Sequence, residues 1–166
     1  MDMFIEKIVR KRKGPVDVLL MLLIIIGTIA VSFLALYFLP SLATIIIIGL
    51  LYLAYILLSK LNVEYEYAVT NGDFDIDMII NQRKRKRMFS ANCKDFEVVA
   101  KVNSSQYTRE IQQCKNVKDY SSHSKTAEVW FISMRTEGKQ TVILFEPLPQ
   151  MIVNFRTFIP RKIFKD

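Results

Sequence analysis

The sequence has few of the residues from which enzymes build common active sites. It contains five glycines, two cysteines and one histidine in 166 residues. So low a glycine content disfavours glycine-rich phosphate-binding loops, and the chain has neither a Walker motif nor a Gly-x-Gly-x-x-Gly motif. His123 stands among serines without a Gly-x-Ser-x-Gly motif, so a nucleophilic triad has no support. We predict that the chain is not an enzyme and uses no cofactor; the alternative is a hydrolase or transferase with unfamiliar motifs.

Metal sites have equally little support in the sequence. Cys93 and Cys114 lack paired Cys-x-x-Cys spacing, and with the single histidine they do not make four zinc ligands. In a cytoplasmic domain they are expected to stay reduced. Asp73, Asp75 and Asp77 alternate with apolar residues, which is typical of one strand face and not of a calcium-binding loop. We predict no metal site and assign these aspartates to a solvated strand face.

Charge is absent from two long stretches. Residues 18–39 would span about 33 Å as a helix, close to the ~30 Å hydrocarbon core of a bilayer. Residues 42–59 are at the short end of a membrane span. Pro40 separates the two stretches, and proline interrupts helical hydrogen bonding. We predict a transmembrane helical hairpin over residues 16–59, with helices at about 18–39 and 42–59.

A cleaved signal peptide and a buried core hairpin are the alternatives for the first stretch. Its basic flank, Arg10–Lys13, suits a signal peptide, but the apolar stretch is longer than the roughly 7–15 residues of such peptides. So unbroken an aliphatic composition also disfavours the core of a soluble protein. The membrane hairpin is therefore preferred.

The basic residues predict how the hairpin is oriented. Residues 1–15, a basic N-terminal segment, carry five Lys/Arg against two acidic residues. The loop around Pro40 carries no charge, and Lys60 follows the second span. Because an excess of Lys and Arg near a membrane stays in the cytoplasm, both termini are predicted to be cytoplasmic.

Residues 60–166 are predicted to form one cytoplasmic domain. Apolar and polar residues alternate on both sides of Asn71-Gly72, which is the strongest short-range signal for a β-hairpin. A polar stretch at 103–125 interrupts the pattern of strands. Further elements are expected as strands at 86–91, 95–102, 127–135 and 140–145, with a short helix near 106–114 and a short strand near 117–120.

The end of the chain changes to a helical pattern. Met151, Phe155 and Phe158 recur at helical spacing, with Pro149 suited to the first turn and Pro160 to the end. The fold class is therefore α+β. We expect an antiparallel, strongly bent sheet or partly open barrel of six or seven strands, covered by a C-terminal amphipathic helix at about 149–159.

Three stretches carry a resemblance to a known family. "EYAVTNGDFDI", "RKRKRMFSANCKDFEVV" and "ILFEPLPQMIVNFRTFIP" resemble the first hairpin, the basic third strand and the final helix of bacterial pleckstrin-homology-like (PH-like) membrane proteins. The whole chain is also similar to a family of small two-span proteins from Clostridia-like bacteria, with the same "NVEYEY" and "QRKRKR" stretches. The resemblance implies the fold and a bacterial inner membrane, and it implies no catalytic residues. The polar insert at 103–125 departs from the compact PH-like pattern.

The run Arg83–Arg87 places five cations in the turn that follows the second predicted strand. The lengths of the first two strands bring this turn back toward the bilayer, where an anionic leaflet attracts each cation by about 1 kcal/mol. A membrane tether excludes a nuclear address, and no stacking platform or reading module supports nucleic-acid binding. Two interpretations stay open: contact with anionic lipid, or a charged strand edge.

The sequence thus favours a non-enzymatic, membrane-anchored PH-like module that acts as a scaffold or interaction domain. The alternative is an accessory subunit of a larger membrane complex with an unidentified protein partner. The expected partner is the lipid bilayer with its anionic head groups. The lipid-contact candidates are the cations of two clusters: Arg10, Lys11, Arg12, Lys13, Arg83, Lys84, Arg85, Lys86 and Arg87.

Overall fold

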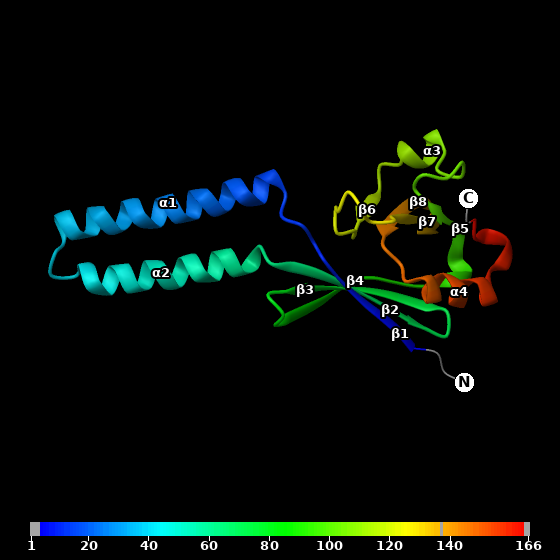
Figure 1. The fold of residues 1–166 in the computed structure, drawn as a ribbon, viewed down its shortest axis with the longest axis horizontal. Helices are drawn as coiled ribbons and strands as arrows, with labels where there is room; N and C mark the ends of the chain where they lie inside the picture. The colour runs from blue at the N-terminus through cyan, green and yellow to red at the C-terminus, as the bar shows by residue number, and fades with distance from the viewer. Residues whose placement is uncertain (1–3, 137, 165–166) are drawn as a thin grey trace.

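The computed structural model describes residues 4–136 and 138–164. A helical hairpin projects from one end of a β domain, and the strands nearest to it run along the same long axis (Figure 1). Residues 1–3 of the predicted basic segment and residues 165–166 of the predicted domain lie outside the described residues.

The hairpin consists of α1 (Pro15–Phe38) and α2 (Ala43–Lys60). Pro15 occupies the first turn of α1, and the carboxylate of Asp17 accepts the backbone N–H of Gly14 at 2.9 Å, which caps this end. Both helices are long and apolar enough to cross a membrane, by length and composition. The predicted break at Pro40 is confirmed, since α1 ends two residues before it.

The strands nearest the hairpin form one antiparallel sheet. Its order is β1 (Phe4–Arg10), β2 (Val63–Thr70), β3 (Asp73–Ile80) and β4 (Lys84–Asn92). The predicted β-hairpin at Asn71-Gly72 joins β2 to β3 and is confirmed.

The first of these strands corrects the sequence analysis, which placed residues 1–15 outside the domain. Phe4–Arg10 pair with β2 along their whole length, and Ile5 and Val9 are buried in the core. Lys7 lies between them and donates its ammonium to the backbone C=O of Glu146 at 2.8 Å. Basic residues masked a period-two pattern here, and the partner strand lies more than fifty residues away in the sequence.

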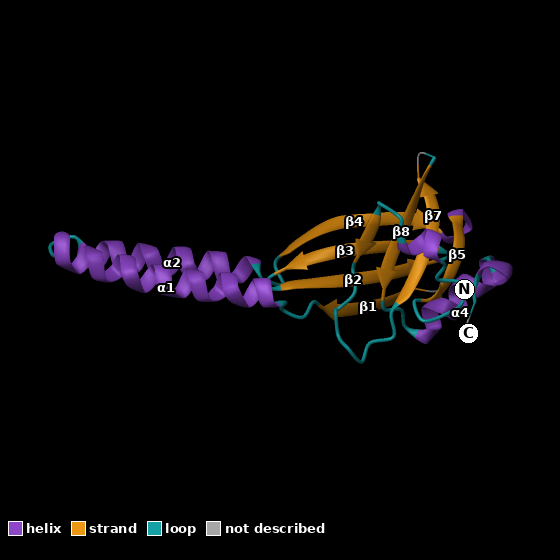
Figure 2. Cartoon of the chain, turned by 90° about the horizontal axis from the view of Figure 1, so that it is seen from above, coloured by secondary structure: helices purple, strands orange, loops and turns teal. Residues whose placement is uncertain are grey.

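The remaining strands form a second sheet that crosses the far end of the first (Figure 2). Its order is β5 (Phe96–Lys101), β7 (Trp130–Thr136), β8 (Lys139–Phe145) and β6 (Val117–Asp119). The pairing of β6 with β8 is parallel, so the all-antiparallel expectation is wrong for this strand. The polar insert, which contains α3 (Arg109–Gln112), is long enough to serve as the connection that a parallel strand requires.

The two sheets enclose one main core, and α4 (Pro149–Phe158) closes it, as the sequence predicted. Phe74 has no exposed surface and lies at the centre of an aromatic cluster. Its ring centroid is 5.1 Å from that of Phe145 and 5.5 Å from that of Phe155 on α4. The strands thus form two packed sheets of a bent, open arrangement, eight strands in the described ranges instead of six or seven.

Gly72 shows why the first turn has its sequence. Its φ is +90°, and a Cβ at this position would lie 3.0 Å from the Sγ of Cys93 and 3.3 Å from the ring of Phe158. Glycine is therefore required both for backbone conformation and for the close approach of the helical end of the chain.

Candidate functional site

The run of five cations is divided between a turn and a strand. The backbone N–H of Arg83 donates to the C=O of Ile80 at 3.1 Å, which closes a turn with Asn81 and Gln82 at its centre. Both central residues have positive φ, 50° and 55°. Because they reverse the chain within so short a turn, β4 begins at Lys84 and not at Lys86 as predicted.

Two arginines of the run form ion pairs within the sheet. The Nη2 of Arg85 lies 2.6 Å from the Oε2 of Glu66 on β2. On the same face, the Nη1 of Arg87 lies 2.8 Å from the Oδ2 of Asp75, and its Nε donates to Asp77. A bulge between β3 and β4 sits next to the Asp77–Arg87 pair. These two cations are therefore neutralised by the sheet itself.

The acidic side of these pairs is buried. Glu66 and Asp77 are only 5% and 8% exposed, so the predicted solvated strand face is wrong for Asp77. The arginines of the neighbouring strand lie across these carboxylates and remove them from water. Burial raises the pKa of Glu66, and the carboxylate of Glu6 raises it further, while Arg85 opposes the shift.

The start of the run has a different environment, beside the end of α2. A groove of about 420 Å³ lies between the last turns of α2 and the β3–β4 turn. We call it the juxtahelical groove. Its walls include Tyr52, Tyr55, Ile56 and Lys60 from the helix, and Arg83 and Lys84 from the turn and β4.

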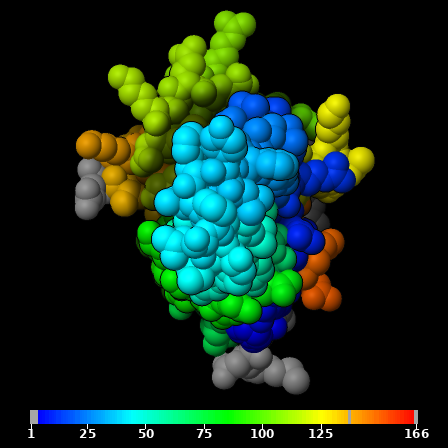
Figure 3. All heavy atoms as spheres, turned by 90° about the vertical axis from the view of Figure 1, so that its left-hand side faces the viewer, coloured from blue at the N-terminus to red at the C-terminus, as the bar shows by residue number. Residues whose placement is uncertain are grey.

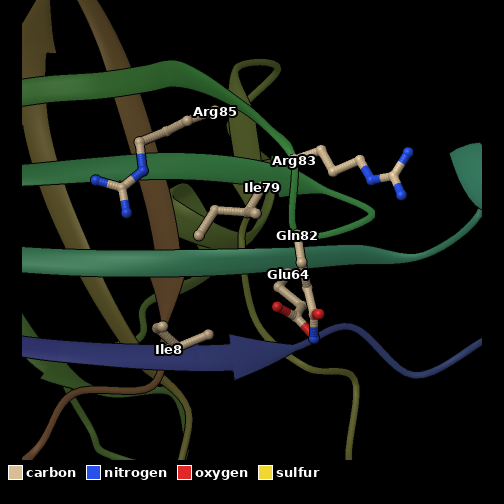
Figure 4. A pocket seen from close by; sticks show the side chains of 6 residues that line it. All are labelled: Ile8, Glu64, Ile79, Gln82, Arg83 and Arg85. Atoms are coloured by element: carbon tan, nitrogen blue, oxygen red, sulfur yellow. The ribbon is translucent and has the colours of Figure 1, made fainter.

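Arg83 and Arg85, which are two positions apart in the run, point in opposite directions. Figure 4 shows Arg83 extending toward the end of the sheet from which the hairpin emerges, whereas Arg85 lies back over the strands. The depression drawn there, about 310 Å³, is lined by Glu64 and Ile79 as well as by arginines. Its mixed charge suits an internal contact of the sheet better than an anion site.

The hairpin end of the domain is held together through Asn62, which follows α2. The backbone N–H of Asn81 donates to the C=O of Asn62 at 2.8 Å, and Arg10 donates to its side-chain oxygen at 2.9 Å. These bonds tie the β3–β4 turn, the end of β1 and the end of α2 into one junction. The turn thus lies beside the end of α2, whereas the predicted return of the run to the bilayer surface stays a prediction.

The N-terminal cluster, Arg10–Lys13, lies at the same end of the domain. The backbone N–H of Lys11 donates to the backbone C=O of Val63 at 3.1 Å, and that of Arg12 donates to the backbone C=O of Ser122 at 2.9 Å. The four residues line a wide, open surface before α1 begins. Lys86, the remaining candidate, is exposed and faces Met78 across the strand pair.

Other groups considered in the sequence are engaged in hydrogen bonds or buried. The hydroxyl of Ser122 donates to the buried carboxylate of Glu146 at 2.6 Å, while the Nδ1 of His123 lies 3.5 Å from Asp119. The serine and the histidine therefore contact two different carboxylates, those of Glu146 and Asp119. Cys93 is fully buried, and burial raises the pKa of its thiol.

The comparison with protein families agrees with this architecture. A family model described as a bacterial PH-like domain (DUF6106) matches residues 1–165. The chain belongs to this family. Because the match spans the hairpin as well as the sheets, the resemblance to bacterial PH-like proteins is confirmed over residues 1–165, while the resemblance to proteins of Clostridia-like bacteria stays a prediction. Searches of curated proteins and of solved structures found no match.

Sequence reasoning missed the helix side of the juxtahelical groove in this PH-like protein. Tyr52, Tyr55, Ile56 and Ser59 stand at i, i+3, i+4 and i+7, which places them on one face of α2. That spacing was visible in the sequence, but it lies within an uncharged stretch that is apolar on every side. Only the fold shows that this face borders the basic turn.

Proposed function

We propose that the protein is a non-enzymatic, membrane-anchored PH-like module that serves as a scaffold or interaction domain at the cytoplasmic face of a bacterial membrane. In this proposal α1 and α2 cross the bilayer, and the basic turn contacts anionic lipid. The observation that carries it is that the two apolar helices leave the β domain at the same end as both basic clusters.

The charge distribution supports this orientation. Arg10–Lys13 precede α1, Lys60 ends α2, and the connection between the helices, residues 39–42, carries no charge. An excess of Lys and Arg on one side of a hairpin favours the cytoplasm for that side. Viewed from its loop, the hairpin is narrower than the β domain around it (Figure 3), so part of the domain surface would face the head groups.

The division of the run refines which cations take part. Arg85 and Arg87 are ion-paired, whereas the ion pairs of the described residues include none from Lys60, Arg83 or Lys84. Cations near an anionic leaflet gain about 1 kcal/mol each if they are free to approach it. The proposal therefore assigns lipid contact to the turn and to the linker before α1.

Fusion reporters at the C-terminus test the orientation. Green fluorescent protein fused after residue 166 is expected to fluoresce in a bacterial host, and alkaline phosphatase fused there is expected to stay inactive. Phosphatase inserted at Ser41, in the loop of the hairpin, is the matched control and should be active. An active C-terminal phosphatase with an inactive Ser41 insertion contradicts the proposal.

Hydrogen exchange of the full chain in nanodiscs tests the lipid contact. Amides of residues 81–84 and 11–13 are expected to exchange more slowly in discs with anionic phosphatidylglycerol than in phosphatidylcholine discs. The hydrogen-bonded strand β7, at the other end of the domain, serves as the internal control. Equal exchange in both kinds of disc excludes the contact.

A further inference from the structure

The juxtahelical groove has two chemically different ends, arranged along the axis of α2. Lys60 is the last residue of the helix, and Tyr52 lies eight residues earlier, about 12 Å along the axis. Tyr52 and Tyr55 are 66% and 53% exposed on the side of the helix that borders the groove. The groove therefore runs from a cationic rim to an aromatic and aliphatic wall.

The rim of the groove is positively charged. Lys60, Arg83 and Lys84 line the groove, and none of the described residues that line it is a carboxylate. Glu66 and Asp75 pair with Arg85 and Arg87, and Glu64 lines the separate depression of Figure 4, which Arg83 and Arg85 also border. Three cations that converge on one cavity attract an anion, and arginine and lysine are the usual ligands of phosphate.

The geometry of the rim is set in advance by the backbone. Asn81 and Gln82 hold left-handed conformations, which glycine and asparagine adopt more readily than other residues. The bond from Asn81 to Asn62 fastens this turn to the residue that follows α2. The turn is thereby fixed with Arg83 extending toward the hairpin end, so little loop ordering is needed when an anion binds.

We propose that the juxtahelical groove binds one anionic phospholipid. Lys60, Arg83 and Lys84 hold its phosphate, and its glycerol and the first part of one acyl chain lie against Tyr52, Tyr55 and Ile56. This inference rests on the proposed function, since the groove meets lipid only if α2 crosses the bilayer. A free phosphate would use the cationic rim and leave the apolar wall unfilled, so a lipid fits both ends.

Native mass spectrometry of the full chain, purified in a mild neutral detergent, tests this binding. Titration with phosphatidylglycerol is expected to fill one site, with at least tenfold weaker binding of phosphatidylcholine. Glycerol 3-phosphate, which has the phosphate without acyl chains, is the competitor. If it displaces the lipid at equal concentration, the groove takes a soluble anion and the proposal is overturned.

Charge variants test which residues bind the lipid. Arg83→Gln with Lys84→Gln is expected to weaken phosphatidylglycerol binding about 30-fold, at about 1 kcal/mol for each cation. Lys86→Gln with Lys118→Gln removes the same charge from exposed positions outside the groove and should change binding less than threefold. Equal losses in the two double variants indicate diffuse attraction and overturn the proposal.

A variant that keeps all cations tests the groove independently of its cationic rim. Ser59→Phe places a ring in the groove and is expected to reduce lipid occupancy at least tenfold, with the thermal midpoint of the chain unchanged. Unchanged occupancy overturns the groove as the site. Lipid binding measured in detergent does not depend on how the chain is oriented in a membrane. If no lipid binds and the C-terminus is cytoplasmic, only the proposal for the groove is overturned. A bound lipid with an external C-terminus overturns only the proposed orientation.

Discussion

The two halves of the basic run, Arg83 with Lys84 and Arg85 with Arg87, are close in sequence and have opposite surroundings. Arg85 and Arg87 lie across buried carboxylates and hold two strands together. Arg83 and Lys84 line a groove without acids next to an apolar helix. The difference teaches that a run of like charges is no single functional unit. Alternation along a strand and the place where a turn ends decide what each cation can bind.

The largest expected effect comes from destabilising the sheet that carries both halves of the basic run. Phe74→Ala should destabilise the domain by about 3–5 kcal/mol, because it deletes the ring at the centre of the aromatic core. Since β3 carries Phe74 and pairs with β4, both halves of the run should lose their positions. Urea unfolding of the detergent-solubilised chain measures the loss.

The matched control for that variant is Val153→Ala on α4, which is 54% exposed and should cost less than about 0.5 kcal/mol. A similar midpoint for the two variants would contradict the central place of Phe74.

The second prediction compares the halves directly. Arg87→Gln should cost about 1–2 kcal/mol, a figure reduced because the Arg87 side chain is 53% exposed, since it leaves the buried Asp77 without its charged donor. Arg83→Gln, with the same charge change, should leave stability within about 0.5 kcal/mol of the parent. Thermal unfolding of both variants in one detergent provides the comparison. Equal losses would abolish the distinction between the two halves.

The third prediction concerns pH. The pKa of Glu66 is raised in the folded chain, so the folded state binds a proton that the unfolded state has already released. This group therefore destabilises the fold as the pH rises through the range between its unfolded and folded pKa, and stabilises it as the pH falls through that range. Glu66→Gln should flatten that part of the stability profile, measured from pH 4 to 7.

Glu97 provides the control for the pH experiment. It is exposed on β5 and pairs with Arg135 at 3.2 Å. Glu97→Gln should leave the pH profile close to that of the parent chain. If both variants give the parental profile, burial of Glu66 has no thermodynamic effect.

The smallest expected effect concerns Gln82, in the turn that precedes the basic run. Gln82→Gly should stabilise the chain by about 0.5 kcal/mol, because glycine tolerates the positive φ at this position. The greater conformational freedom of glycine in the unfolded chain offsets part of this gain. Gln140→Gly, in strand β8, should destabilise it instead. The sign of the two shifts in thermal midpoint is the measurement.

Much of the fold could be predicted from local patterns. The two uncharged stretches, the Asn71-Gly72 hairpin and the helix after Pro149 were each visible within a short window of sequence. The strand β1 was not, because Lys7 lies on its core face while Phe4 and Ile8 lie on its exposed face, and its partner is β2, beyond the whole hairpin. The parallel pairing of β6 was equally hidden, since three residues carry no signal of direction.

The candidate site was predictable only in part. The sequence identified the cations, but it treated Arg83–Arg87 as one group, used Lys60 only to orient the hairpin and gave no role to Tyr52. It also assigned Asp77 to solvent, although the aspartate lies under the guanidinium of Arg87. Ion pairs across strands depend on register, and the bulge between β3 and β4 shifts that register in a way that alternation does not reveal.

By itself the sequence determined where apolar stretches, turns and charges occur, because those depend on residue type and on spacing within a few residues. The tertiary structure alone decided which cations are neutralised and which remain available. That outcome depends on β1 and β4 joining the same sheet from distant parts of the chain, and on the bond between Asn81 and Asn62 that brings the turn to α2. The physical reason is that an ion pair or a groove requires groups to meet in space, which adjacency in sequence does not provide.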